Sequence, residues 1–217
     1  MLEDYVVIDL EMTGLNAKTD AILEVGAVRV RDGRQTETYG AILKCGRELS
    51  ERVVELTGIT SEMAAGGREP EEAMREFFTF LGDDVLVGQN VIFDYSFLKQ
   101  WSVNHGQTFE RNAVDTLKLA RRFLPAEQKK DLESLCTYFG IGRERAHRAL
   151  DDAMATGIVL ERLKQEYGTA GGVSAVCALL PHKKTDARNG TSDGWPQEIC
   201  RALRHPGDGD PGADDAE

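Results

Sequence analysis

The chain has 217 residues, of which 41% are hydrophobic, and its formal net charge is −11. This length and composition suffice for one globular domain of ordinary size with an additional segment. No stretch approaches the roughly 18 consecutive apolar residues of a transmembrane helix, and the N-terminus has no basic flank followed by an apolar segment. The four cysteines form no C-x-x-C pair, which argues against a zinc site or a disulfide framework. We therefore expect a soluble, cytoplasmic protein that does not associate with membranes.

The negative charge is unusual for a nucleic-acid-binding protein, because lysine and arginine normally neutralise phosphates. Residues 168–217 contain five Lys/Arg and eight Asp/Glu, a net charge of −3, so the first 167 residues carry −8. The acidity therefore belongs mainly to the body of the chain. Either the protein avoids nucleic acids, or bound cations and a local basic patch contact the phosphates.

The hydrophobic pattern predicts three strands in succession, followed by strands that alternate with helices. The strands are expected near residues 6–10, 22–30, 36–43, 85–87 and 113–115, with a hairpin turn at Asp32-Gly33. The helices are expected at residues 50–56, 70–81, 91–103, 116–123, 131–139 and 145–167. This order predicts an α/β fold in which helices cover a mixed sheet.

The pattern ends after Gly168. Residues 171–217 are acidic and rich in glycine, a composition typical of disordered segments. We therefore divide the chain into a domain at residues 1–170 and a largely disordered tail at residues 171–217. Within that tail, residues 195–203 could form one short helix.

Two acidic residues interrupt the first apolar strand. Because side chains alternate between the faces of a strand, Asp9 and Glu11 point to the same side, about 6–7 Å apart. Thr13-Gly14 then ends the strand, so the pair lies near the strand end, where sites in α/β sheets usually lie. Neighbouring anions repel and lose hydration, and a divalent cation is the simplest group that offsets this cost. Taken alone, the pattern also fits two solvated acids.

A third acid, Asp94, lies at the start of the helix that follows the fourth strand. We expect Asn90 to cap this helix and Phe93 to lie on its apolar face. Phe97 and Leu98 follow Asp94 by three and four residues, so Asp94 shares their face and turns toward the sheet. Taken alone, Asp94 also fits a first-turn acid that interacts with the helix dipole.

A fourth acid and a histidine open the longest predicted helix. On a helical wheel, Asp152 lies about 60° from the apolar Ala149, whereas Asp151 lies about 160° from it. Asp152 is therefore expected to face inward and Asp151 outward. His147 precedes the helix and can reach the same region, and a histidine is a natural base for an attacking water. Four inward acids would suit two Mg²⁺ ions about 3.5–4 Å apart, an arrangement that serves phosphoryl transfer.

In these segments the sequence resembles the DEDDh 3′–5′ exonucleases, the family of the epsilon proofreading subunit of bacterial replicative polymerases. The matching segments are Asp9-Leu10-Glu11-Met12-Thr13-Gly14-Leu15, Asn90-Val91-Ile92-Phe93-Asp94 and His147-x-x-x-x-Asp152, with support from residues 56–60 and 115–121. The resemblance covers residues 5–167 in order. It implies a ribonuclease H-like fold, with a five-stranded mixed sheet flanked by helices.

The resemblance also implies a role for each matching residue. His147 would be the general base, and Asp115 would be structural. Two Mg²⁺ ions, which Mn²⁺ could replace, would be held by four carboxylates: Asp9, Glu11, Asp94 and Asp152. The substrate-binding residues would lie against the terminal nucleotide or support the third ligand: Met12, Thr13, Gly14, Asn90 and Phe93.

The implied activity is the removal of nucleotides one at a time from a 3′ end, with single-stranded DNA preferred and a polymerase as partner. Residues 9–15 and 147–152 also resemble oligoribonuclease, whereas residues 56–60 and 88–94 resemble the polymerase-associated branch and span more positions. The alternative activity is therefore cleavage of short RNA or of RNA 3′ ends. A third alternative, a non-catalytic binding module on the same fold, would be marked by the loss of a ligand, and all five positions are present.

Overall fold

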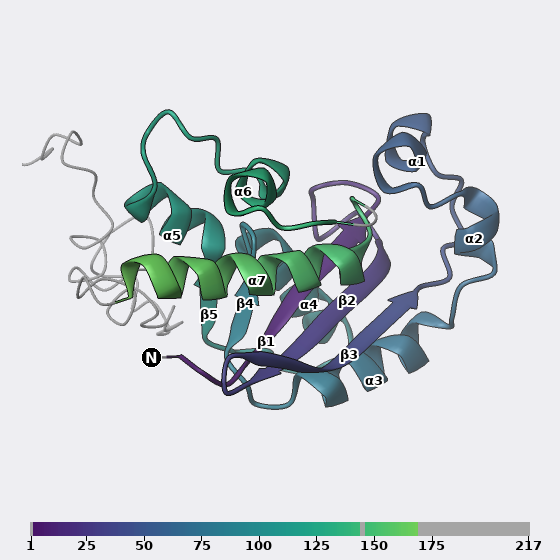
Figure 1. The fold of residues 1–217 in the computed structure, drawn as a ribbon. Helices are drawn as coiled ribbons and strands as arrows, with labels where there is room; N and C mark the ends of the chain where they lie inside the picture. Colours follow the sequence, from purple (N-terminus) through teal and green to yellow (C-terminus); the bar gives the residue numbers. More distant parts are fainter. Residues whose placement is uncertain (1, 144–145, 169–217) are drawn as a thin grey trace, which may run out of the picture.

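The computed structural model describes residues 2–143 and 146–168, which form a sheet flanked by helices (Figure 1). The strands are β1 (Tyr5–Met12), β2 (Ile22–Arg31), β3 (Arg34–Ile42), β4 (Leu86–Gly88) and β5 (Ala113–Asp115). The helices are α1 (Glu51–Thr57), α2 (Ser61–Ala65), α3 (Pro70–Leu81), α4 (Ile92–Asn104), α5 (Thr116–Phe123), α6 (Leu132–Phe139) and α7 (Ala149–Tyr167).

The sheet has an antiparallel half and a parallel half, in the strand order β3-β2-β1-β4-β5. β1 and β3 both pair antiparallel with β2, while β4 pairs parallel with β1 and with β5. Asp32 and Gly33 close the β2–β3 hairpin with φ angles of 49° and 68°, the positive values that a tight hairpin turn requires. The five-stranded mixed sheet expected from the family resemblance is confirmed, and β1 is its central strand.

Helices cover both faces of the sheet (Figure 1). On one face, α3 and α4 pack on even-numbered residues of β1 such as Val6 and Ile8. On the other face, α5, α6 and α7 pack on odd-numbered residues such as Tyr5 and Val7. Because side chains alternate along a strand, Asp9 and the residues in step with it face α7.

Two parts of the chain differ from the sequence-based expectation. The longest helix begins at Ala149, four residues later than expected, because His147 has a φ of 56° and Arg148 is extended. The short helix α2 was not predicted, since five residues are too few to show a helical period; Thr60 caps it by accepting a hydrogen bond from the Met63 N–H. No helix in the described ranges is both long and apolar enough to cross a membrane. The predicted tail at residues 171–217, with its short helix, lies outside the described residues.

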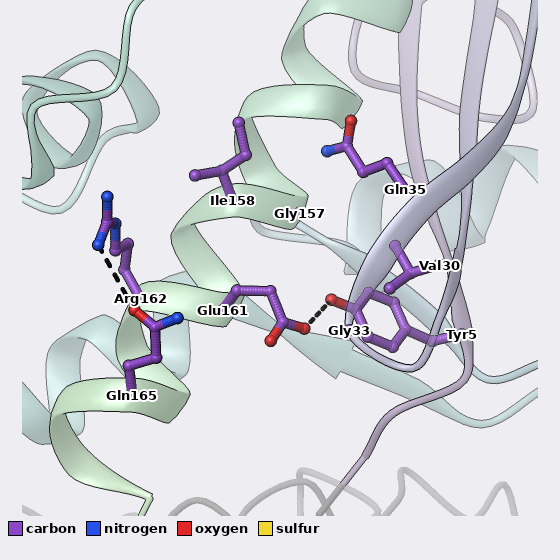
Figure 2. A pocket seen from close by; sticks show the side chains of 9 residues that line it. All are labelled: Tyr5, Val30, Gly33, Gln35, Gly157, Ile158, Glu161, Arg162 and Gln165. Atoms are coloured by element: carbon purple, nitrogen blue, oxygen red, sulfur yellow. Dashed lines mark hydrogen bonds between the residues drawn. The ribbon is translucent and has the colours of Figure 1, made fainter.

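A cavity of about 270 Å³ opens between α7 and the β2–β3 hairpin (Figure 2). Gln35 and Glu161 contribute to its lining, and the Glu161 carboxylate accepts a hydrogen bond from the Tyr5 hydroxyl. Glu161 lies nine residues beyond Asp152 on the same helix, about 13 Å along the axis. The cavity is therefore separate from the acidic residues that the sequence singles out.

Candidate active site

The end of β1 provides the first two candidate ligands. Glu11 is 8% exposed and Asp9 is half-buried, and both lie on the face of the sheet that α7 covers. The pairing register with β2 shifts between Glu11 and Met12. The regular sheet thus ends directly after the two carboxylates, as the sequence predicts.

Asp94 reaches the same place from α4, on the opposite face of the sheet. It is 5% exposed, and its Oδ1 accepts a hydrogen bond from the Leu10 N–H at 2.9 Å. Because Leu10 lies between Asp9 and Glu11, this bond ties the first turn of α4 to β1 at the site. The predicted inward orientation of Asp94 is confirmed.

His147 and Asp152 complete the group from the segment that opens α7. Ligand atoms of Glu11, His147 and Asp152 all lie within 4.8 Å of one another. Asp152 is 6% exposed, and its Oδ2 accepts a hydrogen bond from the His147 N–H at 3.3 Å. The helical wheel identified the more buried of the two neighbours, but Asp151 does not face fully outward as expected: it is half-buried and its Oδ2 is buried. The His147 side chain is exposed and therefore lies on the open side of the cluster.

Burial and mutual repulsion raise the pKa values of these carboxyl groups. Burial raises the pKa of Asp9 well above its ordinary range, and the charges of Asp94, Asp152 and Glu11 raise it further. Burial raises the pKa of Glu11 to about 8, with added repulsion from Asp152 and Glu24. Burial also raises the pKa of Asp94 to about 7. The cluster therefore holds negative charge at a cost that a cation would offset.

Arg143, on the connection between α6 and α7, supplies one positive charge. Its guanidinium forms an ion pair with Oδ1 of Asp152, and the two side chains are 11% and 8% exposed. The same charge opposes the rise in the pKa of Asp9. Among the described residues, nothing accepts a hydrogen bond from the buried Arg143 Nε. Arg143 is thus held mainly by the acidic cluster.

The donor set fits a hard divalent cation. Carboxylate oxygens are the protein ligands that Mg²⁺ prefers. Ligand atoms of Glu11, His147 and Asp152 lie close enough together to contact a single cation. Asp9 and Asp94 are near enough for Asp94 to raise the pKa of Asp9. A cation that bound Asp152 through Oδ1 would compete with the positive charge of the Arg143 guanidinium.

The predicted substrate-binding residues after β1 shape a loop. Thr13 Oγ1 accepts a hydrogen bond from the Ala21 N–H at 2.9 Å, and the Thr13 N–H donates to the Ala21 carbonyl at the same distance. A Cβ atom at Gly14 would lie 2.4 Å from the Asp20 carboxylate, so a larger residue here would require the Asp20 side chain to move. Met12, Thr13 and Gly14 are all half-buried beside the two β1 carboxylates.

Asn90 does not cap α4 as predicted. The cap position is Val91, and no side chain makes a capping hydrogen bond there. Asn90 instead adopts a φ of 58°, a left-handed conformation that asparagine tolerates, and its N–H donates to Asp115 Oδ1 at 2.9 Å. Asp115 also caps α5 through the Leu117 N–H, in keeping with the expected structural role.

Phe93 does not share the buried face of α4. Its side chain is 37% exposed, whereas Phe97, one turn further on, is 2% exposed. Phe93 lies in the first turn of α4, five residues beyond the end of β4, and it points away from the side on which the neighbouring Asp94 is buried. Its exposed ring stands one residue before the candidate ligand Asp94.

Three residues in contact with the site were not singled out by the sequence: Glu24, Arg143 and Arg148. Glu24 lies opposite Glu11 on the neighbouring strand, which becomes visible only once the register of β1 and β2 is known. Arg143 and Arg148 flank His147 in a charged segment. Spacing alone does not separate a solvated arginine from a buried one in such a segment.

The fold and the acidic cluster fit an exonuclease domain. The sequence model of the exonuclease family matches residues 6–160, a range that contains all five candidate residues. The chain therefore belongs to this family.

Its relatives include subunits of bacterial DNA polymerase III. The epsilon subunit from Aquifex aeolicus is 36% identical over 176 residues, which cover 81% of this chain and 87% of that protein. The PolC-type DNA polymerase III from Thermotoga petrophila is 42% identical over 159 residues, which cover 73% of this chain. The chain spans 12% of the length of that PolC-type relative.

Solved structures share the same fold. Exonuclease X in complex with 5′-overhanging duplex DNA gives a TM-score of 0.63 at 24% identity, covering 76% of this chain and 93% of that one. E. coli Exonuclease I in complex with a dA16 oligonucleotide gives a TM-score of 0.64 at 21% identity, covering 77% of this chain and 42% of that one. At these identities the likeness is one of fold.

Proposed function

We propose that this chain is a 3′–5′ exonuclease that removes nucleotides one at a time from single-stranded DNA. The observation that carries the proposal is the convergence of four acidic side chains and one histidine, from three separate segments, at the end of β1. Membership of the exonuclease family supports it. The match to an epsilon subunit over most of its length supports DNA as the substrate.

In this proposal Asp9, Glu11, Asp94 and Asp152 hold two divalent cations. Mg²⁺ is the expected cation because the ligands are carboxylate oxygens, and Mn²⁺ is expected to replace it. When bound, such cations supply positive charge to the attacking and leaving oxygens of a phosphodiester. The four carboxylates then no longer repel one another as they do alone.

His147 is the proposed general base. A ring nitrogen of its exposed imidazole accepts the proton of the attacking water. The water oxygen bonds to phosphorus while the bond from phosphorus to the 3′ oxygen of the preceding nucleotide breaks. That oxygen takes a proton from solvent, so the products are a 5′-mononucleotide and a chain with a new 3′-hydroxyl.

Exposed apolar side chains next to the ligands are suited to contact the terminal bases. Leu15 follows β1 and is 75% exposed, and Ile92 and Phe93 open α4 at 47% and 37% exposed. Stacking of a base on an aromatic ring is tolerant of sequence, because every base has a π-face. Such contacts fit an enzyme that removes any nucleotide.

The test is a digestion series with matched single-stranded DNA, duplex DNA, long RNA and RNA dinucleotides, each labelled at its 5′ end. We expect fastest cleavage of single-stranded DNA, a ladder that shortens from the 3′ end, and no cleavage in excess chelator. The control is the Asp152→Asn variant, which has lost a proposed ligand. A preference for RNA dinucleotides would favour the oligoribonuclease-like alternative, and inert protein at saturating Mg²⁺ and Mn²⁺ would contradict both.

We also infer that the chain works together with a replicative polymerase in the cytoplasm. The match to an epsilon subunit and to part of a PolC-type polymerase supports this partner. The measurement is co-purification of the full chain with the polymerase subunit of the same cell. A chain that elutes alone at micromolar concentrations of both proteins would argue against the association.

A further inference from the structure

Glu24 on β2 is a buried acid that the proposed reaction does not use. It lies directly opposite Glu11 in the antiparallel pairing of β1 and β2, so the two side chains share the face that α7 covers. Glu24 is 5% exposed. A carboxylate in this position could be a further ligand or could serve another purpose, and its contacts distinguish the two.

Both oxygens of Glu24 are directed at the start of α7. Arg148 Nη2 donates to Oε1 at 2.7 Å, and Arg148 Nε lies 3.2 Å from Oε1 and 3.1 Å from Oε2. The Ala149 N–H donates to Oε2 at 3.1 Å. Both Glu24 oxygens therefore accept hydrogen bonds from the start of α7, which indicates that Glu24 binds the helix.

Helix α7 has no cap from its own sequence. Its cap residue, Arg148, is extended and makes no capping hydrogen bond with its side chain. Glu24 takes over this role from another strand, since a carboxylate at a helix N-terminus accepts a free N–H and interacts favourably with the helix dipole. His147 lies two residues before the anchored Ala149 and Asp152 lies three residues after it. An anchor at Ala149 therefore determines where both stand.

Gly26 brings α7 and β2 into direct contact. It is the next residue of β2 on the same face, and a Cβ atom there would lie 2.2 Å from the Ala149 carbonyl carbon and 2.3 Å from the Leu150 nitrogen. The backbones of strand and helix therefore touch at this point. Gly26 sets their separation, and Glu24 sets the position of the helix along the strand.

We infer that Glu24, clamped by Arg148, is a positioning residue that holds the first turn of α7 on β2, so that His147 and Asp152 stand opposite Glu11. Arg148 balances the charge of Glu24, so that a fifth carboxylate does not add its full repulsion to the cluster. The inference rests on the proposed function for the roles of His147 and Asp152. The contacts of Glu24 themselves do not depend on it.

The test compares Glu24→Gln with Asp84→Asn. Asp84 is a matched control because it also accepts hydrogen bonds from arginines of β2, Arg29 at 2.8 Å and Arg31 at 2.6 Å, but lies away from the cluster. For E24Q we expect kcat on a single-stranded DNA oligonucleotide to fall about 10–100-fold, the usual effect of losing a residue that orients a metal ligand. KM for the oligonucleotide should stay within about threefold, because the substrate contacts are retained. D84N should lose about as much thermal stability as E24Q but keep the wild-type kcat.

A second readout does not depend on catalysis. Binding of Mn²⁺, followed by calorimetry, should weaken about tenfold or more in E24Q and stay unchanged in D84N. Arg148→Gln should show the same behaviour as E24Q, because it removes the other half of the clamp. An E24Q protein whose kcat and Mn²⁺ affinity match those of D84N would overturn the inference. If the wild-type chain cleaves no nucleic acid, the proposed function fails, whereas the Mn²⁺ titrations still decide the role of Glu24.

Discussion

Asp151 and Asp152 are adjacent acids in very different surroundings. Asp152 is buried in the cluster, while Asp151 is half-buried beside it. We expect Asp152→Asn to lower single-turnover cleavage at saturating Mg²⁺ by at least about 100-fold, because it removes a proposed ligand. Asp151→Asn should change the rate by no more than about threefold. Large and equal losses from the two substitutions would show that the first turn of α7 is oriented differently in the active enzyme.

Arg143 pairs with Oδ1 of Asp152, one of the two oxygens through which Asp152 could bind a cation. We expect Arg143→Met to lower the melting temperature in excess chelator, because the buried Asp152 then loses its partner charge. The same variant should bind Mn²⁺ at least about threefold more tightly, because the competing guanidinium is gone. Calorimetric titration checks the affinity. Arg29→Met, which breaks an ion pair with Asp84 away from the site, is the control.

Weaker Mn²⁺ binding by the Arg143 variant would instead mean that Arg143 supports the shape of the site. In that case its positive charge would matter less than its packing. The two effects separate at high ionic strength, since salt screens the competition between charges more than it alters packing.

The orientation of individual candidate ligands was predictable where the repeat of one strand or one helix determines which way the side chain points. The alternation of β1 orients Asp9 and Glu11, and the helical period orients Asp94 and Asp152. Glu24 was missed because its importance depends on a register between two strands, which neither strand encodes alone. The family resemblance, in turn, assigned the roles, which periodicity does not supply.

At the scale of elements, the contact between β2 and α7 is the most sensitive to a small change. A methyl group at Gly26 would overlap the backbone of Ala149. We expect Gly26→Ala to lower the free energy of unfolding by about 1–3 kcal/mol, the usual cost of overpacking. It should also lower kcat, because the added methyl group would push the start of α7 away from the sheet. His147, just before the helix, and Asp152, in its first turn, would then move away from β1. Urea unfolding and steady-state cleavage measure the two effects.

Gly46→Ala is the control for this substitution, because a Cβ atom at Gly46 would meet no atom within 4 Å. It should leave both stability and kcat close to the wild-type values. Full activity in the Gly26 variant would mean that the strand and the helix can separate without moving the ligands.

Element boundaries were predictable wherever a residue with a local mechanism marks them. The helices expected from residues 50, 70 and 131 begin close to those positions, where Ser50 and Asp131 cap α1 and α6 and Pro70 opens α3. The predictions that were wrong are the capping role of Asn90 and the start of α7 near His147, and both residues adopt left-handed conformations. Those conformations are imposed by tertiary contacts such as the hydrogen bond from Asn90 to Asp115, and local sequence does not reveal them.

At the scale of the molecule, we expect the site to couple cation binding to the stability of the fold. The pKa values of Glu11 and Asp94 are raised to about 8 and about 7, from ordinary values of 4.5 and 3.8. At a pH between the ordinary and the raised pKa of each group, the folded, metal-free protein binds a proton that the unfolded chain has released. The stability that these groups contribute is therefore present at low pH and is lost as the pH rises through about 8.

A bound cation favours the ionised carboxylates and should reverse this loss. We expect Mg²⁺ to raise the melting temperature by a few degrees more at pH 8 than at pH 5.5. Thermal unfolding at both pH values, with chelator and with Mg²⁺, provides the measurement. In the Asp94→Asn variant the difference between the two pH values should shrink. Equal gains at both pH values in the wild-type protein would contradict the link between these groups and the cation.

The net charge of −11 also has a partial explanation at this scale. Four of the negative charges belong to the cluster, and two divalent cations would balance all four. Composition alone argued against nucleic acid because it counts the carboxylates but not the ions that they bind. The order of the elements was predictable from the sequence, whereas the electrostatics of the assembled site was not.

The ligands come from positions 9 and 11, from position 94 and from position 152, and the helix seated on Glu24 and Gly26 ends at Tyr167. During synthesis, the first two ligands leave the ribosome more than a hundred residues before the last one. No partial chain that ends before residue 147 contains the proposed base or the fourth acid, so under the proposed function a growing polypeptide would not cleave DNA until the domain is nearly finished. A chain cut between α5 and α6 would likewise give two fragments, and neither would be expected to cleave nucleic acid alone. Nuclease activity would return only when the fragments rejoin, which makes cleavage a direct readout of complete assembly.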